Sequence, residues 1–236
     1  MATAITKRAT TLRGRVLRIG AVVFALAALL ITLVLVAWSI PMGDFAPVRP
    51  IPAIVAQPSD PRLEWQAEPH TCGFHAASAV YKAYGLDVTE RRLRARLGVD
   101  NRSLVFDAGT TGCLHPDMYR ALHQDGFDVV PLDLDSPAHS ANLKSHLEAG
   151  GLAMALIRRH DSGVMHWVVL GSVSDGEVNV LDPLEREIQS EPYQDYWEDR
   201  LLSVFKVQPR SGEPVPVWKL HLRGAVDMVA AFRRSG

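Results

Sequence analysis

The hydrophobic positions of this chain of 236 residues form one unbroken run near its start and, further on, shorter groups at helix and strand spacings. The unbroken run covers residues 19–42, which carry no charge, and only Gly20, Thr32, Ser39 and Pro41 among them are not apolar. As a helix the run would extend for about 36 Å, and the hydrocarbon core of a bilayer is about 30 Å thick. Residues 19–42 are therefore predicted to form a transmembrane helix.

The charges that flank this run are unequal. Five basic residues and no acidic residue lie in residues 1–18, whereas the whole chain has 25 basic and 26 acidic residues. The net charge of −1 for the whole chain argues against a nucleic-acid partner, and by subtraction the remainder carries 20 basic and 26 acidic residues. Because basic residues favour the cytoplasmic side of a membrane, residues 1–18 are predicted to be a cytoplasmic arm. The protein is then a single-pass protein of the inner (cytoplasmic) membrane with an extracytoplasmic domain.

A cleaved signal peptide and a buried soluble helix are the other interpretations of the apolar run. A signal peptide has an apolar region of about 7–15 residues, followed by small residues of the A-x-A type. The present run is longer and ends in Trp38-Ser39-Ile40-Pro41, and tryptophan is common at membrane interfaces. We therefore expect an uncleaved signal anchor.

Three parts follow the predicted anchor. Residues 43–62 are rich in proline and lack periodicity, which indicates an extended linker. Residues 63–210 are long enough for one globular domain. Residues 211–236 form a C-terminal extension with apolar positions at mixed helical spacing, and the sequence leaves open whether it packs on the domain or touches lipid.

Within the domain, helical spacing comes first and strand spacing second. Helices are predicted for residues 72–84 and 90–97, from Pro116 to about Gly126, for residues 141–149, and as a short element at residues 192–199. Strands are predicted for residues 152–157, 167–173, 177–181 and 201–207, with a hairpin turn at Asp175-Gly176. The basic residues of the second helix are expected to form a solvated face: Arg91, Arg92, Arg94 and Arg96. This order indicates an α+β fold with an antiparallel sheet.

The candidate chemistry begins with Cys72, which the pattern places at the start of a helix. The dipole and the unsatisfied N–H groups of a helix N-terminus stabilise a thiolate, the nucleophilic form of cysteine. Gln66 lies six residues earlier, in a segment that Pro69 keeps out of the helix. Its amide is expected to fold back beside the sulfur and to join the Cys72 N–H group in an oxyanion hole.

A nucleophilic cysteine requires a base, and the base requires a partner that orients it. His166 precedes one predicted strand, and Asp182 follows the next one. Since the turn at Asp175-Gly176 pairs these strands, both side chains are expected at the same end of the sheet. His166 would then transfer the proton, while Asp182 would fix its tautomer and stabilise the imidazolium.

The order of these residues resembles that of a known family. Gln66, Cys72-Gly73 at a helix start, His166-Trp167-Val168-Val169, a hairpin and Asp182-Pro183 are similar to the papain-like cysteine peptidases that process double-glycine leaders of bacteriocins, and to their stand-alone bacterial relatives. The resemblance covers about Leu63–Val207 and implies a papain-like fold. It further implies that Cys72 is the nucleophile, His166 the base, Asp182 the orienting acid and Gln66 the oxyanion donor, and that the substrate is a peptide or protein.

Two features depart from the pattern of that family. The family usually has Asp before the cysteine and Gly-Pro after it, where this chain has Thr71 and Gly73-Phe74-His75. Its best-known members face the cytoplasm as parts of ABC exporters, whereas this domain is expected outside the membrane. The departures concern the double-glycine substrate more than the three catalytic residues. The chain is therefore predicted to be a membrane-anchored peptidase of leader or secreted peptides, with an exporter as one candidate partner.

Other interpretations stay open. The run from Gln66 to Gly73 also resembles phytochelatin synthases, which implies a γ-glutamyl-cysteine transpeptidase. A non-catalytic domain that binds peptides and recruits them to an exporter is the third hypothesis. Each site residue also has an ordinary structural alternative, such as a small buried hydrophobe for Cys72 or a turn residue for Asp182.

The remaining cysteine and histidines add no second site to this prediction. Cys113 is expected to be a buried thiol, and a disulfide between Cys72 and Cys113 is the alternative that an extracytoplasmic location permits. His70 and His75 bracket the proposed nucleophile, but no histidine has metal-ligand spacing with a second cysteine or an acidic cluster. No metal or other cofactor is predicted.

Overall fold

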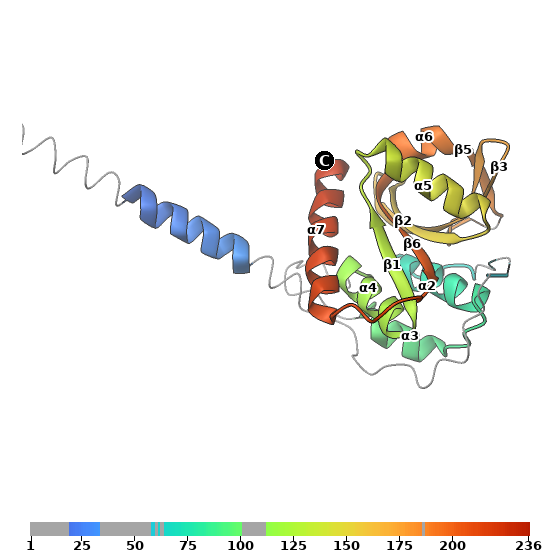
Figure 1. Cartoon of the computed structure of the whole chain (residues 1–236), viewed down its shortest axis with the longest axis horizontal. Coiled ribbons are helices and arrows are strands. Elements are labelled where there is room, and N and C mark those ends of the chain that lie inside the picture. Colours follow the sequence, from blue (N-terminus) through green and yellow to red (C-terminus); the bar gives the residue numbers. More distant parts are fainter. Residues whose placement is uncertain (1–18, 34–57, 60, 62–63, 101–111, 186) are drawn as a thin grey trace, which may run out of the picture. The chain divides into compact units, whose positions relative to one another are not determined.

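The computed structural model describes residues 19–33, 58–59, 61, 64–100, 112–185 and 187–236 (Figure 1). The chain divides into two units, Met1–Trp38 and Ser39–Gly236. In the first unit, residues 19–33 form a helix whose side chains are all exposed. Across the described ranges, no helix has both the length and the apolar character that a membrane crossing requires. Residues 34–42 of the predicted span, the arm 1–18 and most of the linker 43–62 lie outside the described residues.

The second unit is built on one antiparallel sheet of six strands in the order β1-β6-β2-β3-β4-β5. The strands are β1 (Phe127–Leu132), β2 (Leu152–Arg158), β3 (Met165–Ser174), β4 (Glu177–Leu181), β5 (Gln189–Pro192) and β6 (Leu201–Pro209). The helices are α2 (Cys72–Ala83), α3 (Glu90–Leu97), α4 (His115–Gln124), α5 (Pro137–Glu148), α6 (Tyr193–Asp195), the π-helix η1 (Tyr196–Arg200) and α7 (Val217–Ser235). The predicted α+β class with an antiparallel sheet is confirmed.

Two hydrophobic clusters lie on opposite faces of this sheet. One cluster joins α2, α3, α4 and α7 to the strand side chains Leu156, Trp167 and Val169. The other joins α5 and the segment of α6 and η1 to the side chains Val168 and Leu170. Consecutive β3 residues thus belong to different clusters, as alternation along a strand requires. The sheet is covered by helices on both faces, and the first cluster is the one that contains Cys72.

The β3–β4 hairpin has the predicted turn and one irregularity. Asp175 and Gly176 have φ values of 53° and 84°, the left-handed conformation that a tight two-residue hairpin turn requires. Between Leu170 and Val173 the register with β4 shifts, which places one extra residue in β3. The hairpin therefore has one register near its turn and another near its open end.

Several details differ from the sequence predictions. Strands β1 and β5 were not expected, and α5 begins at Pro137 rather than at Ala141. The expected solvated face of α3 is wrong for Arg96, which is 1% exposed and whose Nη2 lies 2.8 Å from Asp125 Oδ1. The reason is that α3 packs against α4, so that one side of this short basic helix is covered.

The C-terminal helix α7 packs against α4 and β6. A Cβ atom on Gly224 would lie 2.7 Å from the backbone nitrogen of Pro116, so only glycine permits this close approach of the two helices. The Tyr119 hydroxyl donates a hydrogen bond of 2.8 Å to Asp227 Oδ2. One face of α7 is therefore fixed on the domain, which answers the packing question that the sequence left open.

Candidate active site

Cys72 is the first residue of α2, as predicted. The turn before it is held by Thr71, whose backbone N–H and hydroxyl donate to the carbonyl oxygen of Glu68 at 3.2 and 2.9 Å. The Cys72 side chain is 9% exposed and lies at the edge of a cavity. The helix start therefore presents a nearly buried thiol to a space that a substrate can enter.

His166 and Asp182 meet at the open end of the β3–β4 hairpin, as predicted. His166 is the second residue of β3, and Asp182 directly follows β4. His166 Nε2 lies 2.6 Å from Asp182 Oδ1, and both residues are buried. The same carboxylate oxygen accepts the backbone N–H of Leu184 at 2.8 Å. Asp182 is thus held in place by its own turn while it contacts the imidazole.

The charge state of this pair follows from its surroundings. Burial lowers the pKa of His166, but the side-chain hydrogen bonds to Asp182 and to Cys72 outweigh it and raise the pKa to about 9. Burial raises the pKa of Asp182, but His166 acts against it, and the net pKa is lowered. Because Asp182 occupies Nε2, Nδ1 is the ring nitrogen left for Cys72. The structure thus brings three of the four predicted site residues together.

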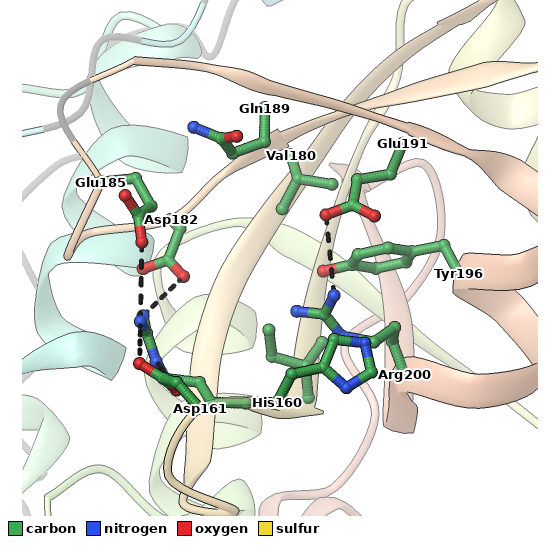
Figure 2. A pocket seen from close by; sticks show the side chains of 11 residues that line it. His160, Asp161, Val180, Asp182, Glu185, Gln189, Glu191, Tyr196 and Arg200 are labelled. Carbon is green, nitrogen blue, oxygen red and sulfur yellow. Dashed lines mark hydrogen bonds and ion pairs between the residues drawn. The ribbon is translucent and has the colours of Figure 1, made fainter.

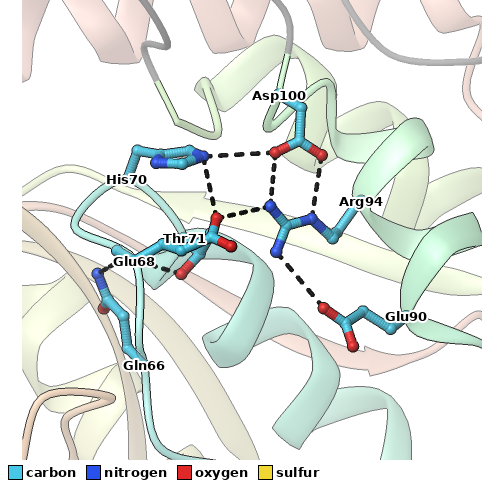
Figure 3. A network of polar contacts seen from close by, with 7 residues as sticks. All are labelled: Gln66, Glu68, His70, Thr71, Glu90, Arg94 and Asp100. Atoms are coloured by element: carbon cyan, nitrogen blue, oxygen red, sulfur yellow. Dashed lines mark hydrogen bonds and ion pairs between the residues drawn. The ribbon is translucent and has the colours of Figure 1, made fainter.

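Gln66 lies in the loop before α2 and is buried. Its backbone N–H donates to the Pro183 carbonyl oxygen at 2.9 Å, which ties this loop to the residue after Asp182. Its side-chain Nε2 donates to the Glu68 carbonyl oxygen at 2.6 Å, the same oxygen that Thr71 contacts (Figure 3). One N–H of the amide is engaged in this way, and its Oε1 is buried without a hydrogen-bond partner, so the oxyanion role of Gln66 stays a prediction.

The loop that carries Gln66 is supported by a network of ion pairs and hydrogen bonds that the sequence analysis did not predict. Arg94 of α3 donates to Glu68 at 2.8 Å and to Asp100 at 2.6 and 3.0 Å, and its pairing with them lowers the pKa of both carboxyl groups (Figure 3). His70 lies 3.5 Å from Glu68 and 3.4 Å from Asp100. The spacing of Glu68, His70 and Asp100 would suit a metal ion, with ligand atoms within 4.8 Å of one another. The guanidinium already supplies the positive charge there, so we assign no metal.

Asp182 also lines a polar cavity, which is separate from the cavity beside Cys72 (Figure 2). Its volume is about 330 Å³. Arg159 donates to Asp182 Oδ2 at 3.1 Å, to Asp161 at 2.9 Å, and lies 3.5 Å from Glu185. This half-buried arginine connects the Asp182 carboxylate to the surface, and its positive charge contributes to the lowered pKa of Asp182.

The cavity beside the thiol, hereafter the Cys72 cavity, has a volume of about 490 Å³. It is lined by Pro69, His70, Cys72, Gly112, Cys113, Leu114, His115, Leu156, Val164, Met165, Trp167, Met228 and Ala231. Cys113 is buried, and burial raises the pKa of its thiol well above the ordinary value. Both cysteines are free, so the structure does not contain the alternative Cys72–Cys113 disulfide.

Comparisons with known proteins give only distant likenesses. No protein-family model matches the sequence, and no curated protein matches it significantly. One similar solved structure is a double glycine motif protease from an AMS/PCAT transporter in complex with the leader peptide, at 14% identity and a TM-score of 0.47, covering 66% of this chain and 97% of that one.

Two further solved structures show similar coverage. The peptidase domain of Streptococcus ComA, a bifunctional ABC transporter involved in a quorum sensing pathway, has 15% identity and a TM-score of 0.44, covering 63% of this chain and 98% of that one. The N-terminal peptidase C39-like domain of the toxin secretion ATP-binding protein from Vibrio parahaemolyticus has 16% identity and a TM-score of 0.38, covering 59% and 98%. Likenesses of this size do not decide a function, which has to be argued from Cys72, His166 and Asp182.

Proposed function

We propose that this protein is a membrane-anchored cysteine peptidase that hydrolyses peptide bonds through Cys72, His166 and Asp182. The observation that carries the proposal is the 2.6 Å contact between His166 and Asp182, with a thiol at the N-terminus of α2, that of Cys72, as a further cause of the raised pKa of His166. A nucleophile, a base and an orienting acid in this order are what acyl transfer through a thioester requires. A non-catalytic peptide-binding domain would have no need of the three together.

The reaction begins when the Cys72 thiolate attacks the carbonyl carbon of the scissile peptide bond. The resulting oxyanion accepts the Cys72 backbone N–H and the second N–H of Gln66 Nε2. His166 then donates its Nδ1 proton to the leaving amine, the C–N bond breaks, and a thioester remains on Cys72. A water molecule gives one proton to His166 and attacks the thioester, which releases the new carboxylic acid and restores the thiolate and imidazolium; the acid then loses its proton to solvent.

A leader or secreted peptide is the substrate class that we propose, on the strength of the family resemblance of the sequence. Transfer of the acyl group to an amine, as in the phytochelatin-synthase alternative, would follow the same first half of the reaction. Supplying glutathione as an acceptor separates the two: for a hydrolase, the products and the rate do not change. A new product that contains glutathione would instead favour the transpeptidase.

A peptide with a thiol-reactive electrophile tests the catalytic proposal directly. We expect the wild-type protein and Cys113→Ala to be labelled, and Cys72→Ala to stay unlabelled, with the adduct located by mass spectrometry. Cys113 is the matched control because it is the other cysteine of the chain and lines the same cavity. Labelling that survives Cys72→Ala would rule out Cys72 as the nucleophile.

Membrane anchoring through residues 19–42 is the second part of the proposal. Its support is the uncharged apolar run with five basic residues before it. A reporter that is active only outside the cytoplasm, fused after Gly236, is expected to be active, and the protein is expected in the membrane fraction after alkaline washing. An inactive reporter would overturn the orientation, and release by the wash would overturn the anchor.

A further inference from the structure

The C-terminal helix α7 forms part of the wall of the Cys72 cavity. Met228 and Ala231 line the cavity from α7, although they lie more than 150 residues after Cys72 in the chain. Leu156 and Trp167 line it from the sheet. The side chain of Val164 lines it as well and is 60% exposed, so it marks the side that is open to solvent. The wall beside the thiol thus combines side chains of the sheet and of α7.

This wall is held against the domain by contacts in the middle and at the end of α7. In the middle of the helix, Gly224 packs directly on Pro116, and the Tyr119 hydroxyl donates to Asp227. Near its end, Arg234 donates to the Leu202 carbonyl oxygen at 3.5 Å, while its own carbonyl oxygen accepts a hydrogen bond from Arg158. Met228 and Ala231 lie between these attachments and are buried. These contacts hold Met228 and Ala231 in place at the wall of the cavity.

Apart from Cys72, His70 and His115, the described side chains that line the Cys72 cavity are apolar. Among the described residues that line it, none is Asp, Glu, Lys or Arg. Burial lowers the pKa of His115 to about 3, so this ring is neutral at physiological pH, and it shares a hydrogen bond of 2.6 Å with Ser203. A charged substrate side chain would lose its hydration here without gaining a partner. The volume of about 490 Å³ falls within the range of about 300–1,000 Å³ that ligand pockets occupy.

We infer that α7 is a specificity element of the proposed peptidase: the Cys72 cavity takes one uncharged, apolar side chain from a residue close to the scissile bond, and Met228 and Ala231 limit its size. This inference rests on the proposed function, because it assigns a subsite to the same thiol. A substrate with only glycines at the cleavage site would place no side chain in this cavity. A single methylene in an apolar pocket changes selectivity by about 10- to 200-fold, so a truncation in this wall has a measurable effect.

Irreversible peptidyl ketone probes that differ in one side chain provide the test. The rate of Cys72 labelling of the full-length protein is measured for probes with alanine, leucine, phenylalanine, aspartate or lysine at that position. We expect the leucine and phenylalanine probes to react at least about 10-fold faster than the charged ones. Met228→Ala is expected to raise the phenylalanine-to-leucine ratio about 10-fold, because it enlarges the cavity.

Leu220→Ala is the matched control. Leu220 is also a buried apolar residue of α7, but it does not line the cavity, so its truncation removes similar packing and should leave the probe ratio unchanged. Val164→Asp is the second variant, because an exposed residue tolerates substitution and the new charge should slow the apolar probes. Equal rates for charged and apolar probes, or an unchanged ratio in Met228→Ala, would overturn the inference.

Hydrolysis of the corresponding unmodified peptides separates the two proposals. Side-chain preference in labelling without any cleavage would refute the peptidase and leave the subsite standing. Cleavage without side-chain preference would refute the subsite and leave the peptidase standing.

Discussion

Two groups of buried charges in this domain have similar contacts and different surroundings. In the structural group, between α2, α3 and α4, Arg96 lies 2.8 Å from Asp125, and the Tyr81 hydroxyl donates to the same carboxylate at 2.5 Å. In the candidate catalytic group, His166 lies 2.6 Å from Asp182. The structural pair is 1% exposed on both sides, whereas Asp182 lines one cavity and the residues on either side of His166, Met165 and Trp167, line another.

The difference shows that a short buried ion pair is not by itself a sign of catalysis. Arg96 and Asp125 are both buried, and neither lines either of the two cavities described above. His166 keeps one ring nitrogen for Cys72, and Asp182 reaches the surface through Arg159. The candidate catalytic group therefore differs in two respects: His166 has a ring nitrogen that Asp182 does not contact, and cavities lie beside the group. We expect the first group to govern stability and the second to govern activity.

The largest expected effect is on activity. His166→Ala removes the group that protonates the leaving amine, so kcat/KM for peptide cleavage by the folded variant should fall by about 10²- to 10⁴-fold. His123→Ala is the matched control, because His123 is also buried but accepts the Val215 N–H far from the thiol. It should lower Tm and keep the activity per folded molecule. Full activity in His166→Ala together with a loss of activity in His123→Ala would contradict the assignment of His166 to the catalytic group.

The next effect is on stability. Asp125→Ala leaves the buried Arg96 guanidinium without this carboxylate, and removing one partner of a buried ion pair costs about 3–5 kcal/mol. Urea denaturation should show this loss in the free energy of unfolding, while kcat/KM per folded molecule stays close to the wild-type value. A large loss of activity in the folded variant would show that the two groups are coupled.

A shift of the pH profile is expected next. His166, with its pKa raised to about 9, is protonated below that pH and can donate to the leaving amine. The value of kcat/KM should therefore fall as the pH rises through about 9. In Asp182→Asn the carboxylate no longer stabilises the imidazolium, so this alkaline limit should move to lower pH. Values of kcat/KM measured between about pH 6 and 10 test this shift. An unchanged alkaline limit would show that Asp182 does not stabilise the imidazolium.

The smallest effect is expected for the network around Arg94, which resembles neither group because it is partly exposed. Arg94→Lys keeps the charge but loses the forked contact with Glu68 and Asp100, which supports the loop that carries Gln66. Because exposed ion pairs contribute about 0.2–1 kcal/mol, kcat should fall only a few-fold, with KM nearly constant. Arg92→Lys on the exposed side of α3 serves as the control. A loss above 100-fold would place Arg94 in the catalytic machinery.

The sequence predicted the central elements of the domain and missed its two edges. The helix at Cys72 and the β3–β4 hairpin follow from local signals, namely a periodic pattern and an Asp175-Gly176 turn. Strand β1 contains Pro131, and β5 is polar and ends in Pro192, so neither has the pattern of a buried strand. Both are edge strands, where proline and polar residues are tolerated because one side of the strand has no neighbour.

The candidate site was predicted in part for a related reason. Cys72, His166 and Asp182 could be placed because each stands at the end of a recognisable element. The Arg94 network and the wall from α7 depend on contacts between segments that are distant in sequence, which no local pattern reports. The same limit explains why the burial of Arg96 was not predicted. Its partner Asp125 is 29 residues away in the sequence, and no local pattern brings the two together.

The extra residue of β3 limits which insertions and deletions the hairpin can accept during evolution. Near the turn, Val173 and Val178 pair on the face covered by α5, while toward the open end Val169 and Leu181 pair on the other face. Both pairings hold only because one residue is inserted between Leu170 and Val173. Deletion of one residue there would move every β3 side chain on one side of it to the opposite face of the sheet. Insertions in related chains should therefore accumulate at the turn, while the length of β3 stays constant.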